Sequence, residues 1–252
     1  MTTQTDQIIS NTGTRLSLRY TAPIHKPTFV WFCGFKSDIC GSKVTELERW
    51  AIENGFGFLA FDYTGHGQSE GAFTDGTISV WRADALSAIA ARTDGDLILV
   101  GSSMGGWLAL LCALELQARI AALVLIAPAP DFTDKLMWPD LSPQQQEQIL
   151  LEGVTLRPSE YDDPYPITRD LIEDGKKWSL LDDIIPIDSP IHILQGMQDP
   201  DVPWQHALCL ADKVASQSVT IELIKDGDHR LSRSEDIARL LRVCTSLTRA
   251  ET

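Results

Sequence analysis

The feature that most restricts how this chain can fold is the motif Gly101-Ser102-Ser103-Met104-Gly105, which separates two strongly patterned segments. An apolar run of strand length, 96–100, precedes it, and a segment rich in Ala and Leu, 107–116, follows it as an expected helix. The order strand, Gly-x-Ser-x-Gly, helix predicts a sharp turn, the nucleophile elbow, with its central serine in a strained backbone conformation. Side chains two positions before and after that serine would collide with the neighbouring strand or helix, which explains the two flanking glycines.

Two residues of this turn are expected to take part in chemistry. Ser103 is the candidate nucleophile, and the N–H of Met104 is expected to donate to an oxyanion, because the first N–H groups of a helix have no partner within the helix. The motif alone is also compatible with an ordinary flexible turn. The strand and helix on its two sides favour the elbow.

Strand and helix patterns alternate along most of the chain, which predicts a mostly parallel sheet flanked by helices and joined by right-handed crossovers. Ligands of such sheets bind at the carboxyl ends of the strands. Ser42 is expected to cap one helix, and Pro203 to begin another. The expected strands span 7–10, 16–20, 28–33, 57–63, 96–100, 119–126, 190–194 and 219–224, and the expected helices span 42–54, 77–92, 107–116, 204–214 and 231–247.

The alternation stops between residues 131 and 188, where prolines, aromatic residues and carboxylates accumulate. This stretch is too long for a loop, so we expect a cap inserted into a single domain whose core is 1–130 and 189–252. Helices are expected at 142–151 and 167–178. Met137 and the aromatic residues here have two interpretations, as the lining of an apolar substrate tunnel or as packing between cap and core. The aromatic residues are Trp138, Tyr161, Tyr165 and Trp178.

A serine hydroxyl is a weak nucleophile unless a base lies within hydrogen-bond reach, and a histidine held by a carboxylate is the usual base. His229 follows the last strand in a Gly-Asp-His turn and is the candidate base. Asp199 follows the preceding strand and is the favoured acid, with Asp201 as its rival. His66 lies in a glycine-rich loop after the strand 57–63, and we interpret it as structural because His229 is the better base.

A second oxyanion donor is expected where the strand 28–33 ends in Gly34-Phe35. This position, upstream of the elbow, is where the N–H of Phe35 could face the carbonyl attacked by Ser103. The alternative is an ordinary turn between a strand and a helix.

Composition narrows the class of protein. The formal net charge of -14 argues against a nucleic-acid surface, which needs a basic patch. The five cysteines are scattered without metal-ligand spacing, so we expect reduced thiols, no metal site and a cytoplasmic protein. No apolar run reaches the length of a membrane span, and the first residues lack the basic and apolar regions of a secretory signal.

Four segments carry a resemblance to a known family: 101–108 (Gly-Ser-Ser-Met-Gly-Gly-Trp-Leu), 61–69 (Phe-Asp-Tyr-Thr-Gly-His-Gly-Gln-Ser), 196–204 and 228–230. They resemble the α/β-hydrolase family of mycophenolic acid acyl-glucuronide esterase and palmitoyl-protein thioesterase, from about residue 29 to the C-terminus. The resemblance implies an α/β-hydrolase fold, an acylated or small-molecule substrate and no cofactor. The absence of a visible transit peptide suggests a bacterial relative.

Matching motifs assign the nucleophile to Ser103, the acid to Asp199 and the base to His229, in the chain order typical of α/β-hydrolases. We therefore expect a serine hydrolase that cleaves esters or thioesters through an acyl-enzyme, with the thioesterase and acyl-glucuronide esterase activities implied by resemblance only. A serine peptidase and a lyase or C–C hydrolase would share the same three residues. A ligand-binding receptor on a retained hydrolase fold is the alternative from a different class.

Overall fold

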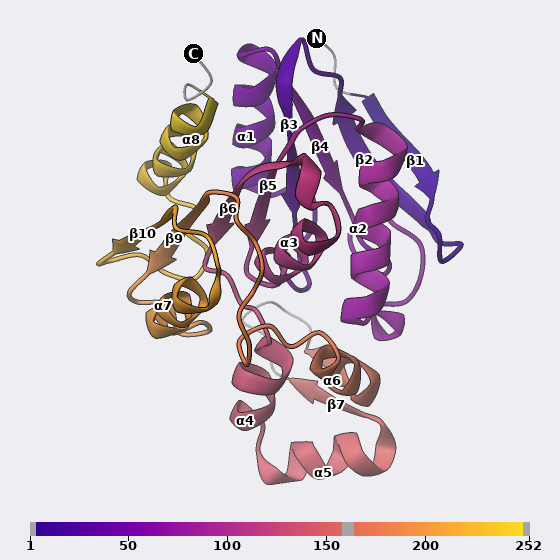
Figure 1. The fold of residues 1–252 in the computed structure, drawn as a ribbon. Coiled ribbons are helices and arrows are strands. Elements are labelled where there is room, and N and C mark those ends of the chain that lie inside the picture. Colours follow the sequence, from indigo (N-terminus) through magenta and orange to yellow (C-terminus); the bar gives the residue numbers. More distant parts are fainter. Residues whose placement is uncertain (1–3, 158–163, 249–252) are drawn as a thin grey trace.

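A computed structural model describes residues 4–157 and 164–248. Its centre is an eight-stranded sheet with the order β1-β2-β4-β3-β5-β6-β9-β10 (Figure 1). The strands β1 and β2 are antiparallel to their neighbours, whereas all pairs from β4 to β10 are parallel, as the sequence predicts. The strands are β1 (Gln4–Ile9), β2 (Arg15–Thr21), β3 (His25–Phe32), β4 (Phe56–Phe61), β5 (Leu97–Ser102), β6 (Ile120–Ile126), β9 (Ile191–Gly196) and β10 (Val219–Ile224).

Helices cover both faces of this sheet. On one face α1 (Ser42–Glu53) packs beside α8 (Ser234–Thr248), and on the other α2 (Ile78–Arg92) packs beside α3 (Met104–Glu115). The helix α7 (Trp204–Lys213) packs on β9 and β10. Because β5 lies between β3 and β6 and its residues 97–101 are buried, the turn that follows β5 is held by tightly packed neighbours.

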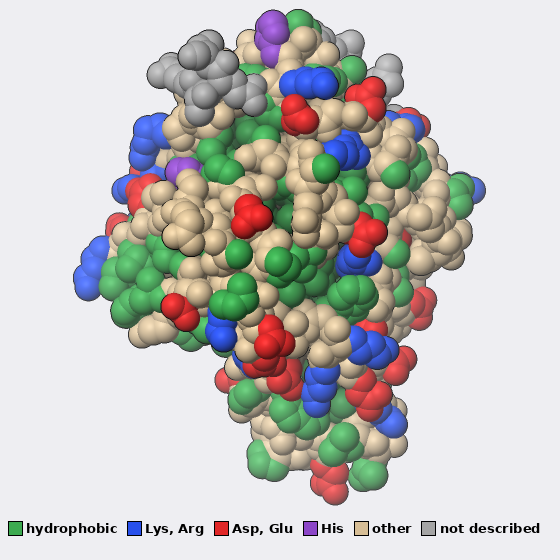
Figure 2. Space-filling model, viewed as in Figure 1, with side chains coloured by type: hydrophobic (Ala, Val, Ile, Leu, Met, Phe, Trp, Pro, Cys, Tyr) green, Lys and Arg blue, Asp and Glu red, His purple; other side chains and the backbone are tan. Residues whose placement is uncertain are grey.

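Most of the described part of the segment 131–188 forms a narrower lobe beyond the carboxyl ends of the parallel strands, and its last residues return to the core beside α7 (Figure 1 and Figure 2). It contains a π-helical turn (Thr133–Met137), α4 (Trp138–Asp140), α5 (Pro143–Glu152) and α6 (Arg169–Lys176). Two short strands, β7 (Val154–Arg157) and β8 (Tyr165–Thr168), pair antiparallel within it.

Two buried carboxylates hold this segment in place, one by joining its two ends and the other by joining it to α2. The carboxylate of Asp131 accepts hydrogen bonds from the N–H groups of Leu180 and Leu181, both at 2.8 Å. The carboxylate of Asp174, on α6, accepts from both the N–H and the hydroxyl of Ser79, each at 2.7 Å, at the start of α2. Removing either carboxylate would leave backbone N–H groups without a hydrogen-bond acceptor.

The structure corrects several helix starts, among them that of α3, which begins at Met104 rather than at 107. Gly41 rather than Ser42 is the N-cap of α1, and Pro203 is the N-cap of α7 rather than its first residue. The helix α6 begins at Arg169 rather than at 167, because the preceding residues form β8 and Thr168 caps the helix through its side chain. The helix α8 begins at Ser234 rather than at 231, because residue 231 has a left-handed φ of 45°.

All five cysteines are free, with Cys33, Cys112 and Cys244 buried and the other two exposed. Among the helices of the described residues, none is both long and apolar enough to cross a membrane.

Candidate active site

The nucleophile elbow has the strained geometry that its sequence predicts. Ser103 has φ 55° and ψ −122° and is the N-cap of α3. A Cβ at Gly101 would lie 2.4 Å from the carbonyl oxygen of Gly105, and a Cβ at Gly105 would lie 2.1 Å from that of Phe32. Because real Cβ contacts are never this short, both positions require glycine. The N–H of Ser103 donates to the carbonyl of Ile126 at 2.9 Å, which fixes the turn against β6.

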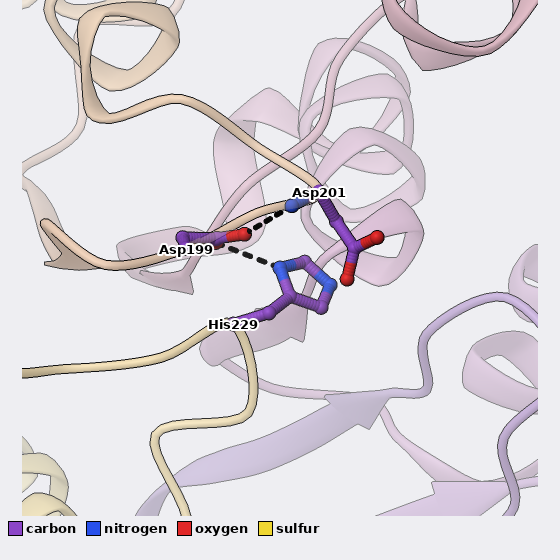
Figure 3. Close-up of side chains that lie close together, drawn as sticks. All are labelled: Asp199, Asp201 and His229. Atoms are coloured by element: carbon purple, nitrogen blue, oxygen red, sulfur yellow. Dashed lines mark hydrogen bonds and ion pairs between the residues drawn. The ribbon is translucent and has the colours of Figure 1, made fainter. Parts of the chain in front are cut away.

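Three side chains that are distant in the sequence meet at this turn. The Nε2 atom of His229 lies 3.0 Å from the Oγ atom of Ser103, and its Nδ1 atom lies 2.7 Å from the Oδ2 atom of Asp199 (Figure 3). Ser103 follows β5, Asp199 follows β9 and His229 follows β10, so all three come from the carboxyl ends of parallel strands. With its proton on Nδ1, the imidazole donates to Asp199 and accepts from the serine hydroxyl, as a general base must.

Hydrogen bonds from the protein hold the Asp199 carboxylate in a fixed orientation. Its Oδ1 atom accepts from the N–H groups of Asp201 and Val202, both at 2.8 Å. Its Oδ2 atom accepts from the side-chain amide of Gln195 at 3.2 Å in addition to the imidazole. The Asp199 side chain is 0% exposed, so these donors take the place of water around its two oxygens.

Gln195 is a supporting residue that the sequence interpretation missed. It is fully buried at the end of β9, and its amide also donates to the carbonyl oxygens of Gly196 and Val202, both at 3.1 Å. The signal was available, since a glutamine within an otherwise apolar strand four residues before the candidate acid is unusual for a buried position.

Asp201, the rival acid, is exposed and donates its backbone N–H to Asp199 rather than accepting from the imidazole. Asp199, Asp201 and His229 each have one possible metal-ligand atom within 4.8 Å of the other two, a spacing that is compatible with a metal site. Two ligand atoms on a tetrahedral zinc ion would be about 3.3 Å apart, whereas the imidazole and Asp199 are 2.7 Å apart. This short contact fits a shared proton better than two ligands of one ion.

The two expected oxyanion donors flank the nucleophile. Met104 is the first residue of α3, and a Cβ at Gly34 would lie 3.5 Å from the Cβ of Ser103, so the turn containing Phe35 is adjacent to the elbow. Within the described part of the chain, neither the N–H of Phe35 nor that of Met104 has a hydrogen-bond acceptor. Both groups can therefore donate to a substrate oxygen.

His66 holds the backbone next to Phe35 through a hydrogen bond. Its Nε2 atom accepts from the N–H of Lys36 at 3.2 Å, and its Nδ1 atom lies 3.2 Å from the carbonyl oxygen of Thr64. Only 3% of His66 is exposed, and this burial lowers its pKa to about 4, so the ring is neutral at neutral pH. These contacts agree with the interpretation of His66 as structural.

Aromatic rings connect the Phe35 turn to the segment 131–188. The Phe35 ring lies 5.6 Å from that of Phe132 and 5.7 Å from that of Tyr165, measured between centroids. Met137 is buried, and Trp178 donates its indole N–H to the hydroxyl of Ser79 at 2.8 Å, so these two residues pack the segment on the core. Trp138 is partly buried against the same core. The remaining aromatic residue, Tyr161, lies outside the described residues.

Comparison with known proteins places the chain among enzymes of one fold. Residues 41–242 match the model of the "Alpha/beta hydrolase family". The mouse "Palmitoyl-protein thioesterase ABHD10, mitochondrial" is 35% identical over 221 residues, which cover 87% of this chain and 73% of the relative. The human protein of the same name is 35% identical over 217 residues, which cover 85% and 71%.

Solved structures give the same result. A "Putative hydrolase from Agrobacterium vitis S4" superposes with a TM-score of 0.94 at 41% identity, covering 98% of this chain and 99% of that one. Mouse "Alpha/beta hydrolase domain-containing protein 10" has a TM-score of 0.89 at 31% identity, covering 97% and 98%. The resemblance and the α/β-hydrolase fold expected from the sequence are therefore confirmed.

Proposed function

The chain belongs to the alpha/beta hydrolase family, and from this premise we propose that it is a serine hydrolase that cleaves esters or thioesters of carboxylic acids. The single observation that carries the proposal is the continuous contact from the Ser103 hydroxyl through the His229 imidazole to the Asp199 carboxylate. Relatives named as a thioesterase support the substrate class.

In the proposed mechanism, His229 removes the hydroxyl proton of Ser103 as its oxygen attacks the carbonyl carbon. The oxyanion accepts hydrogen bonds from the N–H groups of Phe35 and Met104. When the tetrahedral intermediate collapses, the imidazolium returns the proton to the leaving alcohol or thiol, and an acyl-serine remains. Water then repeats these steps on the acyl-enzyme with His229 as the base, releasing the acid. These steps use only protein groups and water.

The segment 131–188 is proposed to act as a cap over this site, on a single-domain core made of 1–130 and 189–252. Its proximity to the catalytic turn supports this role, since Tyr165 of β8 packs on the ring of Phe35. The cap would then contribute to the choice of acyl group, because it lies where a substrate must approach the elbow. A cytoplasmic location remains a prediction, and the thioesterase relatives are named as mitochondrial.

The proposal is tested by Ser103→Ala, with Ser102→Ala as a matched control from the same turn. Both variants are assayed on p-nitrophenyl esters, acyl thioesters, an acyl glucuronide, a peptide and a β-diketone. Loss of ester and thioester hydrolysis in the Ser103 variant alone supports the proposal. Cleavage of only the peptide or only the β-diketone by the wild type would instead favour a peptidase or a C–C hydrolase. Binding without turnover of any substrate would favour a receptor.

A further inference from the structure

Asp201 carries a negative charge next to the imidazole without being bonded to it. Its carboxylate is exposed, and one of its oxygens lies within 4.8 Å of a ring nitrogen of His229. Figure 3 shows the Asp201 carboxylate beside the edge of the ring that is turned away from Asp199. Among the ion pairs formed by the described residues, none involves Asp201, so no cation there neutralises its charge.

The position of this charge is fixed by the same contacts that orient the acid. The N–H of Asp201 donates to Asp199 at 2.8 Å, and so does the N–H of the buried Val202. Proline at 200 and at 203 restricts the backbone on both sides. The backbone from which the Asp201 side chain projects is therefore held beside the imidazole.

The field of Asp201 also reaches the opposite side of the site. Burial raises the pKa of the Tyr165 hydroxyl, the positive charge of Arg157 lowers it, and the negative charge of Asp201 raises it. Tyr165 belongs to β8 of the cap segment and packs on Phe35, whose N–H is a proposed oxyanion donor. Arg157 is itself paired with Asp140 at 2.7 Å, so among the described residues Asp201 adds a negative charge without an ion-pair partner to the space beside Tyr165.

The leaving group of a substrate must pass through this region. In the proposed mechanism it receives its proton from the Nε2 atom of His229, so its oxygen or sulfur lies in contact with that atom. Substituents a few bonds away from the oxygen or sulfur then come within several ångströms of the Asp201 carboxylate.

We propose that Asp201 determines the charge preference of the site, favouring esters and thioesters whose leaving group carries a positive charge near the scissile bond and disfavouring anionic leaving groups. This inference rests on the proposed function. Two unit charges about 6 Å apart in a partly solvated site change a rate by roughly threefold to tenfold. Salt weakens the effect because Asp201 is exposed.

Three butyryl thioesters with leaving groups of similar size test the inference: butyrylthiocholine, its neutral 3,3-dimethylbutyl analogue and an anionic 3-sulfopropyl analogue. Values of kcat/KM are measured at low ionic strength for the wild type, Asp201→Asn, Asp201→Glu and Asp94→Asn. Asp94 is the control because it is exposed and lies just before β5, at the end of that strand away from the elbow. For each variant, the ratio of kcat/KM between two thioesters is divided by the same ratio in the wild type, which cancels the intrinsic reactivity of the thioesters.

In Asp201→Asn, the preference for the cationic over the neutral thioester is expected to fall by about threefold to tenfold, and the anionic thioester is expected to gain by a similar factor. Asp201→Glu and Asp94→Asn are expected to keep the wild-type ratios, and 0.5 M NaCl to reduce the wild-type preference. Unchanged ratios in Asp201→Asn, or an equal change in Asp94→Asn, would overturn the inference while leaving the hydrolase intact. A wild type that cleaves none of the three thioesters or the p-nitrophenyl esters would overturn the proposed function and this inference with it.

Discussion

Replacing Asp199 by Asn keeps the size of the side chain but changes which atoms can donate hydrogen bonds. Its Oδ1 atom faces two backbone N–H groups, from Asp201 and Val202, so the oxygen of an Asn would occupy that position. The NH₂ group would then face the Nδ1 atom of His229 across the present 2.7 Å contact. The imidazole would have to accept there and carry its proton on Nε2, toward Ser103, where it cannot act as a base.

In a Ser-His-Asp enzyme, an imidazole held in the wrong tautomer lowers kcat by about 10⁴-fold. We therefore expect kcat of Asp199→Asn for a p-nitrophenyl ester to fall by about 10⁴-fold, and ¹⁵N NMR to show the proton of His229 on Nε2. Asp201→Asn is the matched comparison from the same turn, with a loss of at most about tenfold expected from its charge alone. If Asp199→Asn keeps kcat within tenfold of wild type while Asp201→Asn loses most of it, the assignment of the acid is wrong.

Further expectations concern the elbow, the buried histidine and the cap. Gly105→Ala would bring a Cβ to 2.1 Å from a backbone carbonyl of β3, so we expect it to lower the free energy of unfolding by more than about 3 kcal/mol. The control Gly41→Ala, whose Cβ would have its nearest neighbour at 3.9 Å, is expected to lower it by about 1 kcal/mol or less. Urea titrations measure both free energies. The pKa of His66, lowered from 6.5 to about 4, means that between these values the unfolded chain binds more protons than the folded one. Stability should therefore fall as the pH is lowered from 6.5 to 4, by up to about 3 kcal/mol, with a shallower fall in His66→Gln. Asp131→Ala removes a buried acceptor of two backbone N–H groups in 179–181 and is expected to speed amide hydrogen exchange there, with unchanged exchange in β5 as the internal reference.

The elements that position the elbow could be predicted because several local signals agree there. The run 96–100 is apolar and of strand length, the segment 107–116 is rich in helix formers, and two glycines occupy the positions where any side chain would collide. The order of the strands, with β4 between β2 and β3, was not predicted, because it depends on which distant segments pair.

Other local features were missed because their determinants are weak or lie elsewhere in the chain. The strands β7 and β8 are four residues long each, and the proline at 166 argues against a strand in the sequence. Pairing with each other overrides that signal, which is why the expected helix from 167 begins two residues later. Leu231 continues an apolar helical pattern, but its left-handed backbone ends the turn before α8 can start.

The three proposed catalytic side chains could be selected from the sequence because each follows a strand, and parallel strands bring their carboxyl ends to one edge. The sequence and the family motif favour Asp199 over Asp201, whereas the contact of the Asp199 carboxylate with the imidazole is seen only in the structure. The support from Gln195 likewise depends on the path of the 196–202 turn, which brings its amide against Asp199 and Val202.

Reaction with a fluorophosphonate, followed by peptide mapping with mass spectrometry, tests the proposed nucleophile most directly. One phosphonyl group per chain is predicted, on the Oγ atom of Ser103, with labelling strongly slowed in His229→Ala because the imidazole no longer removes the proton. Labelling of a different residue, or an unlabelled Ser103 in folded protein, would contradict the central claim that this hydroxyl is activated by the contact of 3.0 Å to the imidazole.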